Sequence, residues 1–176
     1  DIHGDHLNKE TLKALNTSNS HFIVPEAVAK QMDGIDNAAI EILNNNNSTS
    51  FKGMDIKATP MYNLPETEDS RHPKGRGNGY ILNIGDKVIY ISGDTEDIPE
   101  MRALQNIDVA FVCMNLPYTM SVEQASDSVL NFKPVIVYPF HFRGQGGLAD
   151  VEKFKSLVNE KNKEIEVRLR NWYPEN

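Results

Sequence analysis

The chain has one cysteine, no long apolar run and fewer basic than acidic residues, and each shortage excludes a class of protein. Cys113 is the single cysteine, so an internal disulfide is excluded, and its place in the apolar run 109–114 indicates a small buried side chain rather than a nucleophile. No apolar run approaches the ~20 residues that a membrane-spanning helix needs, so we expect no membrane-spanning helix in this sequence. The net charge of −7 argues against nucleic acid as a partner, because phosphate binding needs a basic surface.

The remaining composition is that of a folded domain of ordinary size. The chain has 176 residues, of which 39% are hydrophobic and 24% charged, so it can bury a core and is not expected to be disordered. We therefore expect a single domain over residues 1–176.

The first six residues concentrate side chains that bind metals. Asp1, His3, Asp5 and His6 place two carboxylates and two imidazoles in one short segment. Carboxylate oxygen and imidazole nitrogen are ligands that zinc and similar divalent ions accept. An exposed polar tail would also explain this composition, since chain ends are commonly loose and solvated.

Two further candidates follow predicted strands. Asp94 comes after the Val/Ile/Tyr-rich run 87–92, and His141 follows the run 134–140; both runs are typical of buried strands. Loops at strand ends commonly carry sites, because the rigid sheet fixes their backbone. Taken alone, Asp94 would also suit a turn and His141 a core position.

The apolar patterns predict hairpins early in the chain and alternating strands and helices later. Asn8 is expected to cap the first helix, and Ser121 with Gln124 resembles a capping box. The alternation favours a mixed α/β sandwich with helices outside and sheets within. Predicted strands are 21–24, 38–43, 54–59, 80–84, 87–92, 109–114, 135–140 and 165–169, and predicted helices are 9–15, 26–32, 98–105, 121–132 and 148–159. Residues 44–50 separate two of these strands, and the Asn run 44–47 among them is expected to form a turn or the tip of a hairpin.

Several motifs together resemble those of the metallo-β-lactamase superfamily of metal-dependent hydrolases, which carries HxHxDH, a later His, an Asp in a GD(T) turn and a final His. Residues 1–6 read DIHGDH, residues 79–101 read GYILNIGDKVIYISGDTEDIPEM, and NLPYTM and PFHF follow at 115–120 and 139–142. Within the superfamily these segments are most similar to the lactonase and N-acylphosphatidylethanolamine phospholipase-D-like branch. The resemblance implies an αβ/βα sandwich.

Two positions depart from the family motif. Asp1 stands where the family has its first His, and carboxylate oxygen is a harder ligand than imidazole nitrogen, so the first metal position is expected to be weaker or to prefer another ion. The third His of the family corresponds to Asn63 or to His72, and His72 would alternatively be a solvated residue of the loop 71–79. The same loop carries cations that could attract an anionic substrate: Arg71, Lys74 and Arg76.

The resemblance implies a role for each candidate. One divalent ion would be held by Asp1, His3 and either His72 or Asn63, a second by Asp5, His6 and His141, and Asp94 would bridge the two. Zinc is expected, with Mn²⁺ or Fe²⁺ as alternatives. A metal-bound hydroxide would attack a small ester, lactone or phosphodiester, with Asp5 and Asp94 taking part in catalysis. Tyr118 and Arg143 are expected to bind this small-molecule substrate. The alternative is a metal-binding protein of the same fold without turnover.

The chain starts within the motif, whereas in that family strands upstream of it form much of one sheet. We therefore expect residues 1–176 to be the C-terminal two thirds of the domain. Without the upstream strands, the sheet would have unpaired edges.

Overall fold

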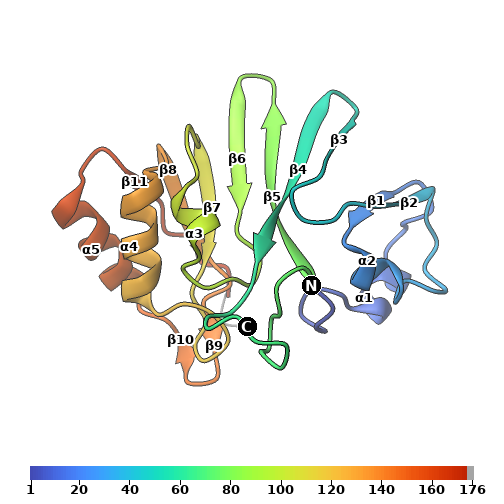
Figure 1. The fold of residues 1–176 in the computed structure, drawn as a ribbon, viewed down its shortest axis with the longest axis horizontal. Helices are drawn as coiled ribbons and strands as arrows, with labels where there is room; N and C mark the ends of the chain where they lie inside the picture. Colours follow the sequence, from blue (N-terminus) through green and yellow to red (C-terminus); the bar gives the residue numbers. More distant parts are fainter. Residues whose placement is uncertain (174–176) are drawn as a thin grey trace.

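The computed structural model describes residues 1–173, and its centre is a seven-stranded sheet in the order β11-β8-β7-β6-β5-β4-β3 (Figure 1). One half of the sheet is antiparallel. Gly85 has a φ of 62°, the left-handed conformation that suits the two-residue turn between β5 and β6. The strands of this half are β3 (Ser48–Phe51), β4 (Met54–Met61), β5 (Gly77–Ile84) and β6 (Lys87–Ile91).

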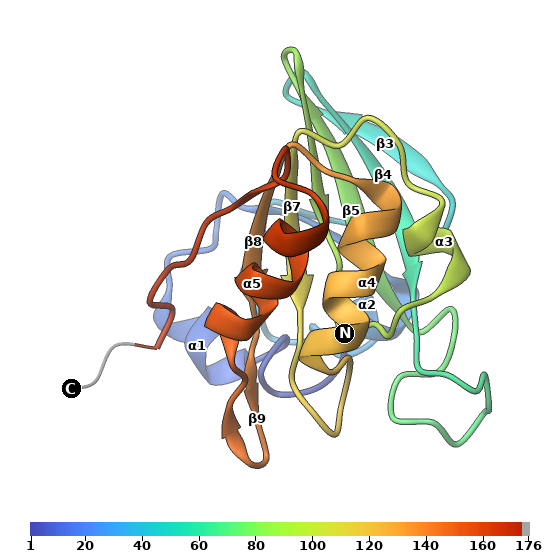
Figure 2. The ribbon, with the colours of Figure 1, turned by 90° about the vertical axis from the view of Figure 1, so that its left-hand side faces the viewer.

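The other half of the sheet is parallel, because helices connect its strands. From β6 the chain continues through β7 (Val109–Cys113), β8 (Ile136–Phe140) and β11 (Glu166–Val167). The connections contain α3 (Pro99–Arg102), α4 (Val122–Phe132) and α5 (Val151–Lys161). Figure 2 shows these helices together over one face of the sheet.

The main core lies between this helical layer and the sheet. Phe154 and Val158 of α5 and Val129 of α4 are buried in one apolar cluster with the strand residues Tyr90 and Val137. Burying a side chain of this size contributes about 1.5–3 kcal/mol relative to its exposure. The packed layer therefore fixes the positions of the strand ends.

The N-terminal residues form a smaller unit beside the sheet (Figure 1). Its elements are α1 (Lys9–Ala14), α2 (Glu26–Ala29) and the parallel strands β1 (His21–Val24) and β2 (Ala39–Ile42). Ile2 and Leu7 pack against the apolar cluster of this unit, which contains Val28, Met32 and Ile35. Both ends of the polar loop between Ile2 and Leu7 are thus anchored.

One edge of the large sheet collects the loops that carry the candidate residues. The strands β4, β6, β7 and β8 all run in the same direction, so their carboxyl ends meet at this edge, and antiparallel β5 begins there. Asn63 follows β4, Asp94 follows β6 and His141 follows β8, while His72 precedes β5. Residues distant in sequence therefore come together in space.

Most predicted elements are present, and the mixed α/β class is confirmed. Ser121 and Gln124 form the expected capping box of α4, and the side chain of Asn8 accepts a hydrogen bond from the Thr11 amide at the start of α1. The turn expected of the Asn run is present at residues 45 and 46, but residues 48–50, which were expected only to separate two strands, belong to β3 and pair with β4. The polar Ser-Thr-Ser sequence of β3 has no apolar run, so the sequence did not indicate this edge strand.

Other elements differ from their predicted lengths. The helices α2 and α3 are single turns, and β11 has only two residues. The last helix starts at Val151, where the Asp150 side chain caps it, because Gly147 and Leu148 form β10, which pairs with β9 (Arg143–Gly144). None of the helices in residues 1–173 is long and apolar enough to cross a membrane.

Candidate metal centre

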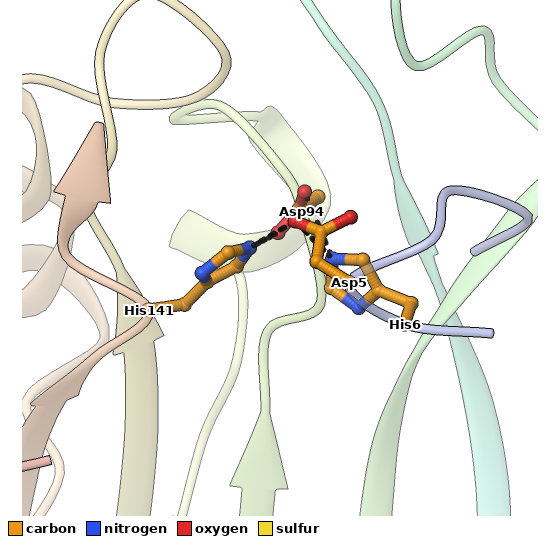
Figure 3. Close-up of side chains that lie close together, drawn as sticks. All are labelled: Asp5, His6, Asp94 and His141. Atoms are coloured by element: carbon orange, nitrogen blue, oxygen red, sulfur yellow. Dashed lines mark ion pairs between the residues drawn. The ribbon is translucent and has the colours of Figure 1, made fainter. Parts of the chain in front are cut away.

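Four side chains bring their metal-binding atoms close together where the strands β6 and β8 end (Figure 3). We name this group the Asp94 cluster: Asp5, His6, Asp94 and His141. The Oδ2 atom of Asp94 lies 3.0 Å from Nε2 of His6, and its Oδ1 atom lies 3.2 Å from Nε2 of His141. Oδ2 of Asp5 lies 3.3 Å from the same His141 nitrogen. The Asp94 side chain is only 3% exposed, whereas that of Asp5 is 54% exposed.

Backbone geometry at Gly93 places Asp94 in this position. Gly93 has a φ of 64°, and a Cβ atom there would lie 2.7 Å from the carbonyl oxygen of Asn78. Only glycine fits such a left-handed, crowded turn. The Ser-Gly-Asp-Thr sequence after β6 therefore turns sharply and directs the carboxylate along the sheet edge.

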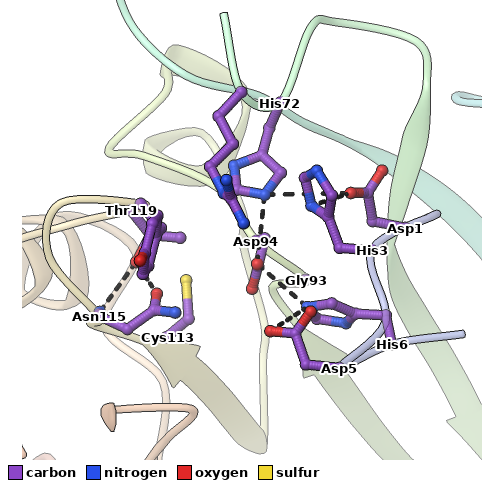
Figure 4. A network of polar contacts seen from close by, with 12 residues as sticks. Asp1, His3, Asp5, His6, His72, Gly93, Asp94, Cys113, Asn115 and Thr119 are labelled. Carbon is purple, nitrogen blue, oxygen red and sulfur yellow. Dashed lines mark hydrogen bonds and ion pairs between the residues drawn. The ribbon is translucent and has the colours of Figure 1, made fainter. Parts of the chain in front are cut away.

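A second group of donors lies beside the first, and we name it the Asp1 cluster: Asp1, His3 and His72 (Figure 4). Oδ2 of Asp1 lies 2.7 Å from Nδ1 of His3 and 4.0 Å from Nε2 of His72. That His72 nitrogen is 3.3 Å from Oδ2 of Asp94. Asp94 thus faces both clusters, and the structure brings together all seven residues that the motifs singled out as metal ligands.

Asn63 is not among these donors but holds one of them. Its Oδ1 atom accepts a hydrogen bond from the His72 amide at 2.8 Å and lies 3.1 Å from Nδ1 of the His72 ring. Its Nδ2 atom donates to the carbonyl of Tyr118 and to Glu96, which fixes the amide orientation. His72 Nδ1 must then carry the proton, and Nε2 faces Asp94 as a potential ligand. Of the two candidates for the third His, the geometry favours His72.

Burial and polar contacts together determine which groups of the centre are charged. Burial disfavours the charged form of Asp94, but polar contacts from His141, His6 and His72 outweigh it and hold the pKa of Asp94 below its usual range. The same contact with Asp94 raises the pKa of His141. Burial, followed by the nearby charges of His72 and Arg71, lowers the pKa of His3 to about 4. At neutral pH the carboxylate is therefore ionised and His3 is neutral, as metal ligation requires.

Three donor atoms of the two clusters support a bound cation. Nδ1 of His3, Nε2 of His72 and Oδ1 of Asp94 are buried and make no hydrogen bond to any of residues 1–173, although nitrogen and oxygen atoms approach each other closely. Buried polar atoms usually have a hydrogen-bond partner. Imidazole nitrogen and carboxylate oxygen converging without mutual hydrogen bonds fit a divalent ion.

The two residues expected to bind substrate each take part in a different cation–π contact. The guanidinium of Arg71 stacks 4.4 Å from the ring centre of Tyr118, and that of Arg143 lies 4.2 Å from the ring centre of Tyr173. Among residues 1–173, neither Tyr118 nor Arg143 makes an ion pair or a side-chain hydrogen bond with the clusters. A cavity of about 310 Å³ adjoins the Asp94 cluster; Asp5, His6, His141 and the aromatic residues Phe111, Phe140 and Trp172 line it.

The sequence does not indicate the contacts that three residues make in the site. Asn115 follows β7, and its Nδ2 atom lies 3.4 Å from Nε2 of His141. The sequence indicates Asn63 only as a possible metal ligand, and it indicates Arg76, which contacts Asp1, only as part of a cationic loop. The position of Asn115 directly after a predicted strand was a signal, whereas nothing local connects Arg76 to Asp1.

A mixed sheet with histidine and carboxylate donors gathered at one edge is the architecture that the motifs implied for metal-dependent hydrolases. Residues 2–141 match the family described as the beta-lactamase superfamily domain, and the chain belongs to this superfamily. A UPF0173 metal-dependent hydrolase from Pyrococcus abyssi is 26% identical over 175 residues, covering 94% of this chain and 75% of that protein. A second from Pyrococcus furiosus is 28% identical, covering 93% and 73%.

Solved structures agree with this assignment. A crystal structure of a metal-dependent hydrolase from Parabacteroides distasonis has a TM-score of 0.86 and 37% identity, covering 98% of this chain and 74% of that one. A metallo hydrolase from Ignicoccus hospitalis shares the fold with a TM-score of 0.75 at 24% identity, covering 96% and 72%. The predicted superfamily, fold and general enzyme class, a metal-dependent hydrolase, are confirmed. The lactonase and phospholipase-D-like branch and the individual ligand roles stay predictions.

Proposed function

We propose that the chain hydrolyses a small ester, lactone or phosphodiester that carries an anionic group, with zinc as the metal. The observation that carries the proposal is the convergence of the Asp1 and Asp94 clusters around the shared carboxylate of Asp94. When bound, a divalent ion lowers the pKa of a coordinated water and polarises the carbonyl or phosphoryl oxygen under attack. Mn²⁺ and Fe²⁺ accept the same ligand types, so metal analysis must decide among them.

In this proposal the residues of the chain divide the work. Asp1, His3 and His72 would hold one ion and Asp5, His6 and His141 a second, and the carboxylate of Asp94 faces both groups. Asp5 is the carboxylate of the centre with the greatest exposure, at 54% of its side chain. A carboxylate oxygen of Asp5 that does not bind the ion would be placed to accept a proton from the attacking water and return it to the leaving group.

The anionic group of the substrate is assigned to Arg71. Of the three cations in the loop 71–76, Lys74 pairs with Glu66 and Glu100, and Arg76 pairs with Asp1. Arg71 forms no ion pair within residues 1–173 and stacks on Tyr118, so its charge is open to a ligand carboxylate or phosphate. The cavity beside the Asp94 cluster supports a small substrate with an apolar part.

The test combines metal analysis with a substrate panel. Protein purified without chelator is expected to contain zinc and to cleave at least one of an aryl ester, a lactone and an aryl phosphodiester. Chelation should abolish this activity and added Zn²⁺ should restore it. Arg71→Gln should raise KM for an anionic substrate but not for a neutral one of the same class. Activity that survives chelation would contradict the proposal.

The replacement of the first motif His by Asp1 and the engagement of Asp1 by Arg76 favour one second candidate, a metal-binding protein without turnover. That candidate predicts a tightly held ion together with no hydrolysis across the whole panel. The same two measurements therefore distinguish it from the enzyme.

A further inference from the structure

The carboxylate of Asp1 is held by Arg76, which directly precedes β5. Nε of Arg76 donates to Oδ1 of Asp1, and Nη2 of Arg76 donates to Oδ2, each at 3.0 Å. The Asp1 side chain is fully buried, and that of Arg76 is 22% exposed. Two parallel hydrogen bonds of this kind form the strongest common type of carboxylate pair. Both oxygens of Asp1 are thus already engaged.

Further contacts fix the guanidinium beside the Asp1 cluster. Nη2 of Arg76 also donates to the carbonyl of Arg71, and it lies 3.4 Å from Nε2 of His3. Gly77 follows Arg76 at the start of β5, and a Cβ atom there would lie 3.3 Å from Oδ1 of Asp1. The backbone at the start of β5 therefore approaches Asp1 closely, directly after Arg76.

This pair changes the charge of one cluster only. The positive charge of Arg76 cancels the negative charge of Asp1, so the pair is neutral, like the imidazole that the HxHxDH motif has at this position. The Asp94 cluster contains two carboxylates, Asp5 and Asp94. Among residues 1–173, their only ion-pair partners within 4 Å are histidines. A divalent cation is attracted by two uncompensated charges there but meets a fixed cation beside the Asp1 cluster.

We infer that Arg76 makes the two halves of the centre unequal. The Asp94 cluster binds the first ion tightly, and the Asp1 cluster binds a second ion only at higher metal concentration because Arg76 compensates Asp1. The inference rests on the proposed metal centre and adds to it an order of loading and the residue that sets it. Because Arg76 acts through Asp1, it is a positioning residue rather than a catalytic one.

The test is a zinc titration of the metal-free full chain by calorimetry, with anomalous diffraction at the zinc edge to locate each ion. Wild-type protein should bind in two steps, the second at least tenfold weaker and located at Asp1, His3 and His72. Arg76→Gln should strengthen the second step at least tenfold and change the first less than threefold. Arg76→Met, which keeps the apolar stem, serves as a second variant should the first not fold.

Lys74→Gln is the matched control. It removes a positive charge from the same loop, but Lys74 pairs with Glu66 and Glu100 rather than with Asp1, so both steps should stay within threefold of wild type. An equal gain in Lys74→Gln would overturn the assignment to the Asp1–Arg76 pair. Two equal steps in wild type, or an unchanged or weaker second step in both Arg76 variants, would overturn the inference. Neither of those results contradicts the proposed function, which fails if wild type binds no ion at the centre, if it hydrolyses no member of the substrate panel, or if its activity survives chelation.

Discussion

Replacing Asp94 by asparagine should separate the stability that a bound ion confers from that of the fold itself. The amide keeps the shape of a side chain that is 3% exposed, so no cavity is created. The charge that faces His6, His72 and His141 is lost, and within residues 1–173 no other carboxylate forms ion pairs with histidines of both clusters. We expect the zinc content to fall to less than one ion per chain, because the shared carboxylate balances the charge of the ions.

The size of the effect follows from ligand linkage. An ion that binds only the folded chain at 100 times its Kd stabilises it by about 2.7 kcal/mol. For a domain of this length, each kcal/mol raises Tm by about 2–4 °C, so wild-type protein should melt roughly 5–11 °C higher in excess zinc. Asp94→Asn should gain less than about 2 °C under the same conditions.

Differential scanning fluorimetry of the metal-free and zinc-supplemented proteins measures both shifts, with ions counted by mass spectrometry. Asp86→Asn is the control, because Asp86 lies in the turn between β5 and β6 and pairs with Lys87, away from the clusters. This variant should keep the full shift. A full zinc shift and an unchanged ion count in Asp94→Asn would refute the bridging role.

Two further substitutions and one labelling experiment test other features of the structure. Asn63→Ala should weaken zinc binding at the Asp1 cluster about 10–100-fold in a metal titration, because His72 loses the acceptor that orients its ring; equal affinity would show that Asn63 is dispensable. Burial raises the pKa of Cys113 to about 11. At pH 8 its thiol should therefore not react with an aromatic disulfide reagent until denaturant is added, and rapid labelling of the folded protein would contradict this. Ser121→Ala removes the cap of α4 and should lower the free energy of unfolding by about 1 kcal/mol in urea, whereas an unchanged midpoint would argue against the cap.

The strands that carry the site could be predicted because their apolar runs are continuous and end in polar residues. Asp94 and His141 follow β6 and β8 as expected, since strands buried under a helical layer need unbroken Val, Ile and Phe. The cap of α4 was also predictable, because the capping box depends only on residues three positions apart. Local patterns therefore account for most of the sheet and the helical layer.

Residues of the loop between β4 and β5 could not be placed in the same way. This loop has no periodic pattern, so the burial of His72 and its contact with Asp94 depend on tertiary packing. The pairing of Arg76 with Asp1 joins residues 75 positions apart, and both residue types are ordinarily read as solvated surface. The edge strand β3 was missed for a related reason, because its pairing with β4 rather than its composition makes it a strand.

Asp94 follows β6, which is the strand where the sheet changes direction. β6 has an antiparallel neighbour, β5, on one side and a parallel neighbour, β7, on the other. The Asp94 carboxylate consequently contacts His72, in the loop that leads into β5, and His141, in the loop that follows β8. We call these the entering segment and the leaving segment. The entering segment belongs to the antiparallel half of the sheet, and the leaving segment belongs to the parallel half. A substitution near His72 can therefore change one part of the centre while the strands that hold His141 keep their packing. The Asp1–Arg76 pair involves the entering side through Arg76, so under the proposed function a substitution of Arg76 would alter one half of the centre and leave the half around His141 unchanged.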